Sequence, residues 1–165
     1  MLILGIDPSL SSTGFAYVDS DTKKILLKGK LNPSKKLTND EKIQYIIVSL
    51  ELLIPEEIDY IILEDGFIGK NKKGSLSLAE LRGALIAYYK YNEYHVIHKQ
   101  PKEIRSKFGL PGNAKKEEVA NKVLSLYPEL LKEIGPYSDG NNKHKTSDIY
   151  DAISIALSFI ESNYE

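Results

Sequence analysis

The stretch that decides the fold of this chain is residues 2–18, which read LILGIDPSLSSTGFAYV. Its pattern predicts a short apolar strand, a polar turn supplied by Pro8 and the serines, and a second strand. Gly14 allows close backbone approach where the chain re-enters the sheet. Asp7 ends the first strand, and because a buried unpaired carboxylate costs several kcal/mol, it needs an amide, a cation or a metal as partner. Taken alone, an aspartate that caps its own turn is the commoner explanation.

The rest of the chain extends this start into alternating strands and helices. Residues 23–31 predict a third strand that completes a meander, and helical spacing of apolar residues predicts a helix from Thr38 or Asn39 up to Pro55. The further elements expected are strands at 58–64 and 94–98, a helix at 75–91, helical turns at 102–108, and helices at 114–126 and 147–162. Because crossover connections force parallel pairing, the predicted class is α/β. We expect a mixed five-stranded sheet, with a three-stranded antiparallel meander plus two parallel strands, flanked by helices on both faces.

Length and composition limit the classes of protein that this chain can represent. Residues 1–165 are expected to form a single domain with a core of its own. The absence of cysteine excludes disulfides and thiolate metal sites and agrees with a cytoplasmic location, in a bacterial cell or a phage-infected host. No segment predicts a membrane span, and the start lacks a basic leader with a cleavage site. The net charge of −1 means that a case for nucleic-acid binding depends on local charge.

Carboxylates end two predicted strands and open the last helix. Asp7 and Glu64 follow apolar strands, and their side chains meet if these strands are neighbours with the same direction. Asp148 and Asp151 are three residues apart and therefore share one face of a helix. Each feature alone has a plain structural explanation, since acids in a first turn suit the helix dipole and Ser147 is a good N-cap.

Four carboxylates gathered at one edge would repel one another unless cations lie among them. Oxygen ligands, without cysteine or a paired-histidine spacing, favour a hard divalent ion such as Mg²⁺ or Mn²⁺. Two such ions roughly 4 Å apart hold the attacking and leaving oxygens of an in-line phosphoryl displacement. The pattern therefore predicts a two-ion site for phosphodiester chemistry.

Four motifs follow one another in the chain: Leu4-Gly5-Ile6-Asp7-Pro8; Leu63-Glu64 with Phe67 in the next loop; Pro101-x-x-Ile104-Arg105 followed by Gly112-Asn113-Ala114-Lys115-Lys116; and Asp148-x-x-Asp151-Ala152-x-x-Ile155-Ala156. In order and spacing they resemble the RuvC-type Holliday-junction resolvases, a family with a ribonuclease H-like fold. The resemblance runs from Leu2 to Ala156. It implies a homodimeric, Mg²⁺-dependent endonuclease that nicks two strands of like polarity in a four-way DNA junction, leaving a 5′-phosphate and a 3′-hydroxyl.

The resemblance also implies a role for each matched residue. The implied metal ligands are Asp7, Glu64, Asp148 and Asp151. Lys116 would contact the scissile phosphate or its developing charge. Arg105 stands where the family usually has lysine, and its planar guanidinium makes phosphate contact a more secure role than catalysis. Phe67 would present an aromatic wedge that unstacks bases of the junction.

Basic residues gather in two stretches of a chain whose overall charge is balanced. One stretch follows Phe67, and the other spans residues 99–116 with Glu103 as its one acid. Lysine runs are usually solvated faces, but two that flank a metal site match a track for DNA phosphates. The residues expected to bind DNA are Phe67, Lys70, Lys72, Lys73, Lys102, Arg105, Lys107 and Lys115, and residues 141–145 are expected to add phosphate contacts. Base readout is not evident, so we expect structure-selective binding.

Two other kinds of function stay open at this level. A ribonuclease H-like nuclease that cuts RNA–DNA hybrids would keep the fold and the metal site and change the substrate. A non-catalytic DNA-junction binding module, or a fragment of an actin-like nucleotide-binding protein, would use the same strand and turn without nicking DNA. The chain is short for the two duplicated domains of the actin-like class. A branch-migration protein as partner is also left open.

Two features outside these motifs carry structural expectations. Asp65 directly follows Glu64 and is expected to be a solvated loop acid. The four tyrosines that gather near the end of the predicted helix at 75–91 are Tyr88, Tyr89, Tyr91 and Tyr94. They pack into the core or, because tyrosine suits interfaces, form a dimer surface. The resembled family dimerises partly through the corresponding helix, which favours the interface.

Overall fold

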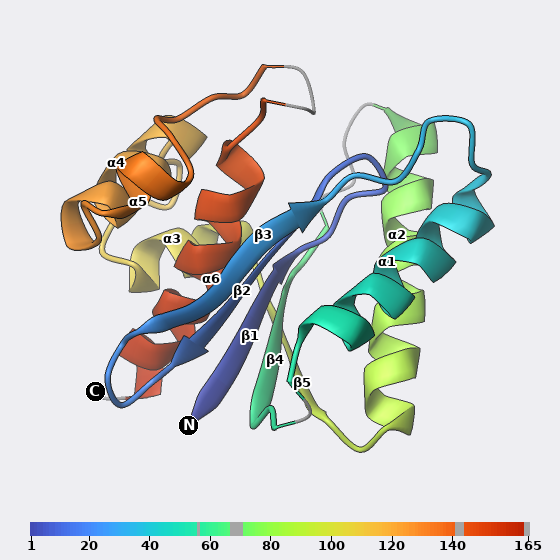
Figure 1. The fold of residues 1–165 in the computed structure, drawn as a ribbon, viewed down its shortest axis with the longest axis horizontal. Helices are drawn as coiled ribbons and strands as arrows, with labels where there is room; N and C mark the ends of the chain where they lie inside the picture. Colours follow the sequence, from blue (N-terminus) through green and yellow to red (C-terminus); the bar gives the residue numbers. More distant parts are fainter. Residues whose placement is uncertain (56, 67–70, 141–143, 164–165) are drawn as a thin grey trace.

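A five-stranded mixed sheet runs through the molecule (Figure 1). The structure is a computed structural model that describes residues 1–55, 57–66, 71–140 and 144–163. The strands are β1 (Leu2–Asp7), β2 (Thr13–Asp19), β3 (Ile25–Leu31), β4 (Tyr60–Glu64) and β5 (His95–Lys99), in the order β3-β2-β1-β4-β5. The β1–β2 and β2–β3 pairs are antiparallel, and the β1–β4 and β4–β5 pairs are parallel. The predicted meander and parallel strands are thus confirmed.

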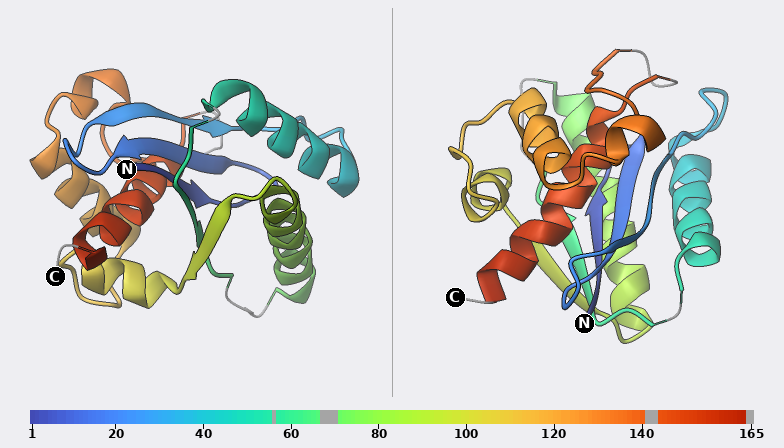
Figure 2. Two further views of the ribbon diagram at one scale, coloured as in Figure 1. Left: turned by 90° about the horizontal axis from the view of Figure 1, so that it is seen from below. Right: turned by 60° about the vertical axis from the view of Figure 1, so that its left-hand side comes forward.

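Helices cover both faces of the sheet, as Figure 2 shows from below. One face carries α1 (Asn39–Leu53) and α2 (Lys72–Tyr91). The other carries α3 (Pro101–Lys107), α4 (Lys116–Leu126), α5 (Leu130–Glu133) and α6 (Ser147–Asn163). The single turn α5 is absent from the sequence prediction. The α2 helix begins three residues earlier than predicted, because the Asn71 side chain accepts a hydrogen bond from the Gly74 N–H and caps it there.

The sheet separates two apolar clusters. Strand β1 contributes to both, because successive side chains point to opposite faces: Leu4 and Ile6 pack on the α1–α2 side, and Ile3 packs on the α6 side. Residues 151–160 of α6 are all buried, since the helix lies between the sheet and the α3–α4 layer. This position accounts for the apolar character of α6. None of the described helices has the length and apolar character needed to cross a membrane.

Two glycines let α6 lie directly on the sheet. A Cβ atom at Gly5 would lie 2.5 Å from the carbonyl oxygen of Ala152 and 2.8 Å from the backbone nitrogen of Ala156. A Cβ atom at Gly14 would lie 2.0 Å from the carbonyl oxygen of Asp148. No side chain other than hydrogen fits at either position, so the predicted close approach at Gly14 is confirmed. It brings the first turns of α6 to the end of β1.

Replacing Gly14 by alanine should lower the free energy of unfolding by at least about 2 kcal/mol, because the methyl group would force α6 away from β2. The matched control is Gly83→Ala on the exposed side of α2, where a Cβ meets nothing within 4 Å and alanine favours the helix by up to about 1 kcal/mol. Urea unfolding followed by circular dichroism measures both. Equal stability of Gly14→Ala and the unchanged protein would contradict the close packing of α6.

Candidate active site

Three of the four predicted acids lie together at one end of the sheet. Asp7 is the last residue of β1, and Asp148 and Asp151 stand in the first two turns of α6. One carboxylate oxygen from each lies within 4.8 Å of the others. The side chains of Asp148 and Asp151 are almost fully buried, and that of Asp7 is mostly so. This cluster, called the acid triad below, combines an acid from the first strand with two acids from the last helix.

Glu64, the fourth predicted acid, borders the triad from the neighbouring strand. Glu64 is the last residue of β4, which runs parallel to β1 with Leu63 paired to Ile6. Asp7 and Glu64 are the next residues on the two strands and therefore stand side by side at the same end of the sheet. Among the described residues Glu64 is not part of the group within 4.8 Å, although its charge raises the pKa of Asp7. Burial raises the pKa of Glu64 itself to about 7, and the charge of Asp151 acts in the same direction.

Burial is also the main reason why the pKa values of Asp7 and Asp151 are raised. Carboxylates of the same site add to this effect: Asp151 raises the pKa of Asp7, and Asp148 raises that of Asp151. Lys116 opposes it at both positions. The ionised triad is thus an unfavourable arrangement that cations stabilise.

Two lysines supply positive charge to the triad. Lys116, the first residue of α4, places its Nζ atom 2.5 Å from Oδ2 of Asp151, 3.9 Å from Oδ2 of Asp7 and 4.0 Å from Oδ1 of Asp148. Burial lowers the pKa of Lys116, but the acids around it outweigh burial and raise the pKa overall. Lys145 places its Nζ atom 2.8 Å from Oδ1 of Asp148. Lys145 was predicted only to add phosphate contacts as part of segment 141–145, although its spacing of three residues from Asp148 is a signal for this ion pair.

The donor set of the triad fits a hard metal ion. Every donor is a carboxylate oxygen, and the chain has no cysteine. Oδ2 of Asp148 is buried and has no hydrogen-bond partner among the described residues. A buried carboxylate oxygen without a partner costs free energy, and a divalent cation would satisfy it. The residues therefore fit a bound Mg²⁺ or Mn²⁺.

The predicted DNA-binding residues are spread over several places. Arg105 of α3 lies close enough to the acids to lower the pKa values of Glu64 and Asp151. Exposed positions near the ends of helices are taken by Lys72, Lys73, Lys102 and Lys115. Phe67 and Lys70 lie outside the described residues. For all of these residues, contact with DNA stays a prediction.

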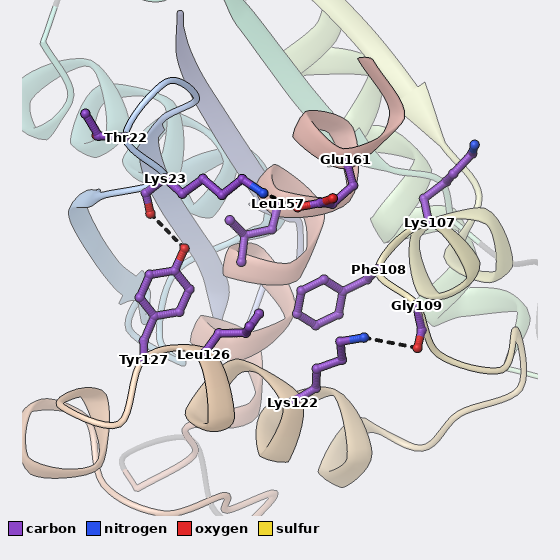
Figure 3. Close-up of a pocket in the computed structure, with 10 residues that line it drawn as sticks. All are labelled: Thr22, Lys23, Lys107, Phe108, Gly109, Lys122, Leu126, Tyr127, Leu157 and Glu161. Carbon is purple, nitrogen blue, oxygen red and sulfur yellow. Dashed lines mark hydrogen bonds and ion pairs between the residues drawn. The ribbon is translucent and has the colours of Figure 1, made fainter. Parts of the chain in front are cut away.

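Lys107 lies apart from the acids, beside the C-terminal part of α6. It lines a cavity of about 530 Å³ together with Phe108, Lys122 and Glu161 (Figure 3). Glu161 is thirteen residues beyond Asp148 on α6, which corresponds to about 20 Å along the helix. The structure therefore does not bring Lys107 to the acid triad.

The expectation of a solvated acid at Asp65 is wrong. Its carboxylate forms an ion pair with Arg82 of α2 and accepts a hydrogen bond of 2.7 Å from Nε2 of Gln100. Nδ1 of His98 lies 3.5 Å from it. Asp65 thus joins the end of β4 to α2 and to the end of β5, and its charge is matched by partners far away in the sequence.

The comparisons with known proteins agree with this geometry. The family model described as crossover junction endodeoxyribonuclease RuvC matches residues 3–159. A relative of that name from Chlorobium phaeobacteroides is 30% identical over 161 residues, which cover 95% of this chain and 80% of the relative. Another, from Brachyspira hyodysenteriae, is 27% identical over 166 residues, covering 99% and 96%.

Solved structures share the fold. Thermus thermophilus RuvC in complex with Holliday junction substrate matches with a TM-score of 0.76 at 19% identity, covering 99% of this chain and 96% of that one. The fowlpox virus resolvase in complex with Holliday junction DNA matches with a TM-score of 0.64 at 16% identity, covering 97% and 99%. The predicted ribonuclease H-like fold is confirmed. The chain belongs to the crossover junction endodeoxyribonuclease RuvC family.

Proposed function

We propose that this protein is a metal-dependent endonuclease that resolves four-way DNA junctions by a pair of nicks. The observation that carries the proposal is the acid triad, in which one carboxylate oxygen of Asp7 at the end of β1 and one each of the buried Asp148 and Asp151 on α6 lie within 4.8 Å of one another, in a member of this family. The relatives named above are crossover junction endodeoxyribonucleases, and the same chemistry would use these carboxylates here. Such a nuclease would act in the cytoplasm, where bacterial or phage DNA is replicated.

The proposed cofactor is Mg²⁺, which Mn²⁺ can replace, with two ions per site. Asp7, Asp148 and Asp151 would hold the ions, and Glu64 would complete the ligands from β4. When bound, the ions would lower the pKa of water and stabilise the charge that develops on the phosphate. Such an ion would also supply a partner for Oδ2 of Asp148, which is buried without one among the described residues.

The reaction places further demands on the residues of the site. A water oxygen attacks phosphorus in line with the P–O3′ bond, which breaks and leaves a 5′-phosphate and a 3′-hydroxyl. Lys116, whose Nζ atom lies within 4.0 Å of all three acids, would contact the scissile phosphate and its developing charge. Arg105 and Lys115 would hold phosphates beside it, and Phe67 would act as the wedge between bases.

A homodimer is part of the proposal because two copies of the chain would place one active site on each of the two strands that are nicked. The outer face of the α1–α2 layer supports it. On α1, the exposed residues Tyr45, Val48 and Leu52 recur at helical spacing and form one apolar stripe. On α2, Leu76 and Tyr91 are also exposed. A second copy would cover this apolar surface.

The four tyrosines near the end of α2 have two different environments, one typical of core packing and one suited to a dimer surface. Tyr89 is buried in the core and makes edge contacts with the rings of Tyr88 and Tyr94, at centroid distances of 5.4 and 5.8 Å. Tyr91 is 87% exposed and belongs to the apolar surface of α2. Core packing therefore explains three of these rings, and Tyr91 is the one available to a partner subunit.

The first test is cleavage of an immobile four-way junction with and without Mg²⁺, beside a fork, a linear duplex and an RNA–DNA hybrid. We expect paired, metal-dependent nicks in the four-way junction. Asp7→Asn should abolish nicking, by at least about 10³-fold, and keep junction binding, because it removes a metal ligand and little DNA contact. Asp40→Asn in the exposed first turn of α1 is the isosteric control and should cleave normally.

Metal-dependent nicking by Asp7→Asn would show that Asp7 is not a ligand in the active site. Preferred cleavage of the RNA–DNA hybrid would favour a ribonuclease H-like function over junction resolution.

In the metal-free protein, the pKa of Glu64 makes stability depend on pH. Its pKa is raised from 4.5 to about 7, so the folded protein binds the proton more tightly than the unfolded chain. This stabilisation is complete below about pH 4.5 and is lost as the pH rises through 7. Glu64→Gln should therefore become more stable than the unchanged protein as the pH rises from 5 to 8, by up to about 3 kcal/mol.

Urea titrations in EDTA measure this difference. The control is Glu80→Gln at an exposed position of α2, whose difference from the unchanged protein should stay constant over the same range. If the difference for Glu64→Gln is also independent of pH, the pKa of Glu64 is not raised in the folded protein, and neither burial nor the charge of Asp151 acts on it as described.

The dimer surface can be tested with two matched leucines. Leu52 of α1 is 81% exposed on the proposed interface, and Leu131 of α5 is 51% exposed on the other side of the sheet. Leu52→Glu should shift the protein from dimer to monomer in sedimentation velocity, because the interface would bury an unpaired charge. Leu131→Glu should stay dimeric. A dimer that both variants leave unchanged would require a different interface.

A further inference from the structure

The chain immediately beyond Glu64 is held in place by Asp65. The Asp65 N–H donates a hydrogen bond of 2.8 Å to the carbonyl of Lys99, directly after the Glu64–Lys99 pair of β4 and β5. Both carboxylate oxygens of Asp65 are used as well: Oδ1 forms an ion pair with Nη2 of Arg82 on α2, and Oδ2 accepts a hydrogen bond of 2.7 Å from Nε2 of Gln100. Backbone and side chain together therefore attach the end of β4 to α2 and to the segment after β5.

The contact with α2 lies in a closely packed part of the molecule. The side chains of Asp65 and Arg82 are 22% and 17% exposed, so solvent screens this ion pair less than an exposed one. Nη2 of Arg82 also lies 3.3 Å from Nδ1 of His98 on β5. A Cβ atom at Gly66 would lie 3.3 Å from Cδ2 of Leu78 and 3.6 Å from Cδ of Arg82, so the chain after Asp65 packs on α2. The position of Asp65 is thus fixed from several sides.

The other acids of the site have a different kind of support. Asp7 ends the central strand β1 and is paired with β2. Asp148 and Asp151 lie on α6, which is packed on the sheet. Glu64 is the last residue of β4, so its position depends on what holds the chain just beyond it. In the described part of the chain, Asp65 supplies these contacts.

We infer that Asp65 is a positioning residue for Glu64, because its contacts with Arg82 and Gln100 set the place from which Glu64 reaches the acid triad. The inference rests on the proposed function, in which Glu64 is a metal ligand, and adds to it the residues that align this ligand. A ligating carboxylate has to be held by its surroundings, and loss of such support typically costs about 10- to 100-fold in metal affinity or activity.

An effect of charge alone predicts a different pattern from positioning. If only charge acts, Asp65→Asn weakens cation binding and Arg82→Gln strengthens it, because the first removes a negative charge near the site and the second removes a positive one. Positioning predicts weaker binding in both variants, since each breaks the ion pair. Gln100→Ala changes no charge and removes one hydrogen bond to Asp65, so only positioning predicts that it weakens binding.

The test measures Mn²⁺ binding to the protein without DNA by isothermal titration calorimetry. Asp65→Asn and Arg82→Gln should each weaken the affinity by about tenfold, and Gln100→Ala by about threefold. In a Glu64→Gln background, Asp65→Asn should cause no further loss, because its effect passes through Glu64. The Mg²⁺ concentration for half-maximal nicking by Asp65→Asn should rise by the same factor, with junction binding in EDTA unchanged.

The matched control is Glu161→Gln, which removes the ion pair with Lys23 near the C-terminal end of α6 and should leave Mn²⁺ affinity unchanged. Gln100 is exposed, so Gln100→Ala remains informative if Arg82→Gln folds poorly. Unchanged affinity in Asp65→Asn, tighter binding in Arg82→Gln, or a further loss in the Glu64→Gln background would each overturn the positioning role. Absence of metal-dependent nicking by the unchanged protein would instead refute the proposed function.

Discussion

The contact on which the rest of the structure depends is the backbone packing of α6 against β1 and β2. Gly5 and Gly14 leave no room for a side chain between the sheet and the backbone of α6. The helix therefore lies close enough for its first two turns to meet the last residue of β1. Acids from the two ends of the chain come together on two regular elements, so their spacing does not depend on a flexible loop.

This packing places like charges in a buried position and so opposes stability. Burial and mutual repulsion raise the pKa values of Asp7 and Asp151, and burial together with Asp151 does the same for Glu64. Lys116, which pairs with Asp151, and Lys145, which pairs with Asp148, offset part of the repulsion. Carboxylates whose charge is only partly balanced favour the binding of a metal ion, and a bound metal ion attracts phosphate. The unfavourable electrostatics of the site are therefore connected to the proposed reaction.

Two neighbouring acids illustrate how surroundings decide the role of a carboxylate. Asp65 follows Glu64 in the chain, but Arg82 pairs with one of its carboxylate oxygens and Gln100 donates a hydrogen bond to the other, and it holds the end of β4 to α2. Oδ2 of Asp148 is buried with no partner in the described part of the chain. The first is a structural ion pair, and the second is free to bind a cation. Residue type and position in the sequence do not distinguish them.

The order of the strands and of all helices except the single turn α5, the mixed sheet and the three acids of the triad follow from the sequence, because alternation, helical spacing and strand ends are local properties. Several contacts between segments that are distant in the sequence were not predicted. Three examples are the ion pair of Asp65 with Arg82, the hydrogen bond from Lys30 to the carbonyl of Lys145, and the distance of Lys107 from the acids. They depend, in turn, on how α2 lies against the end of β4, how β3 lies against the start of α6, and where α3 lies along α6. Tertiary packing decides those distances, and charge and polarity act over distances in space rather than along the chain.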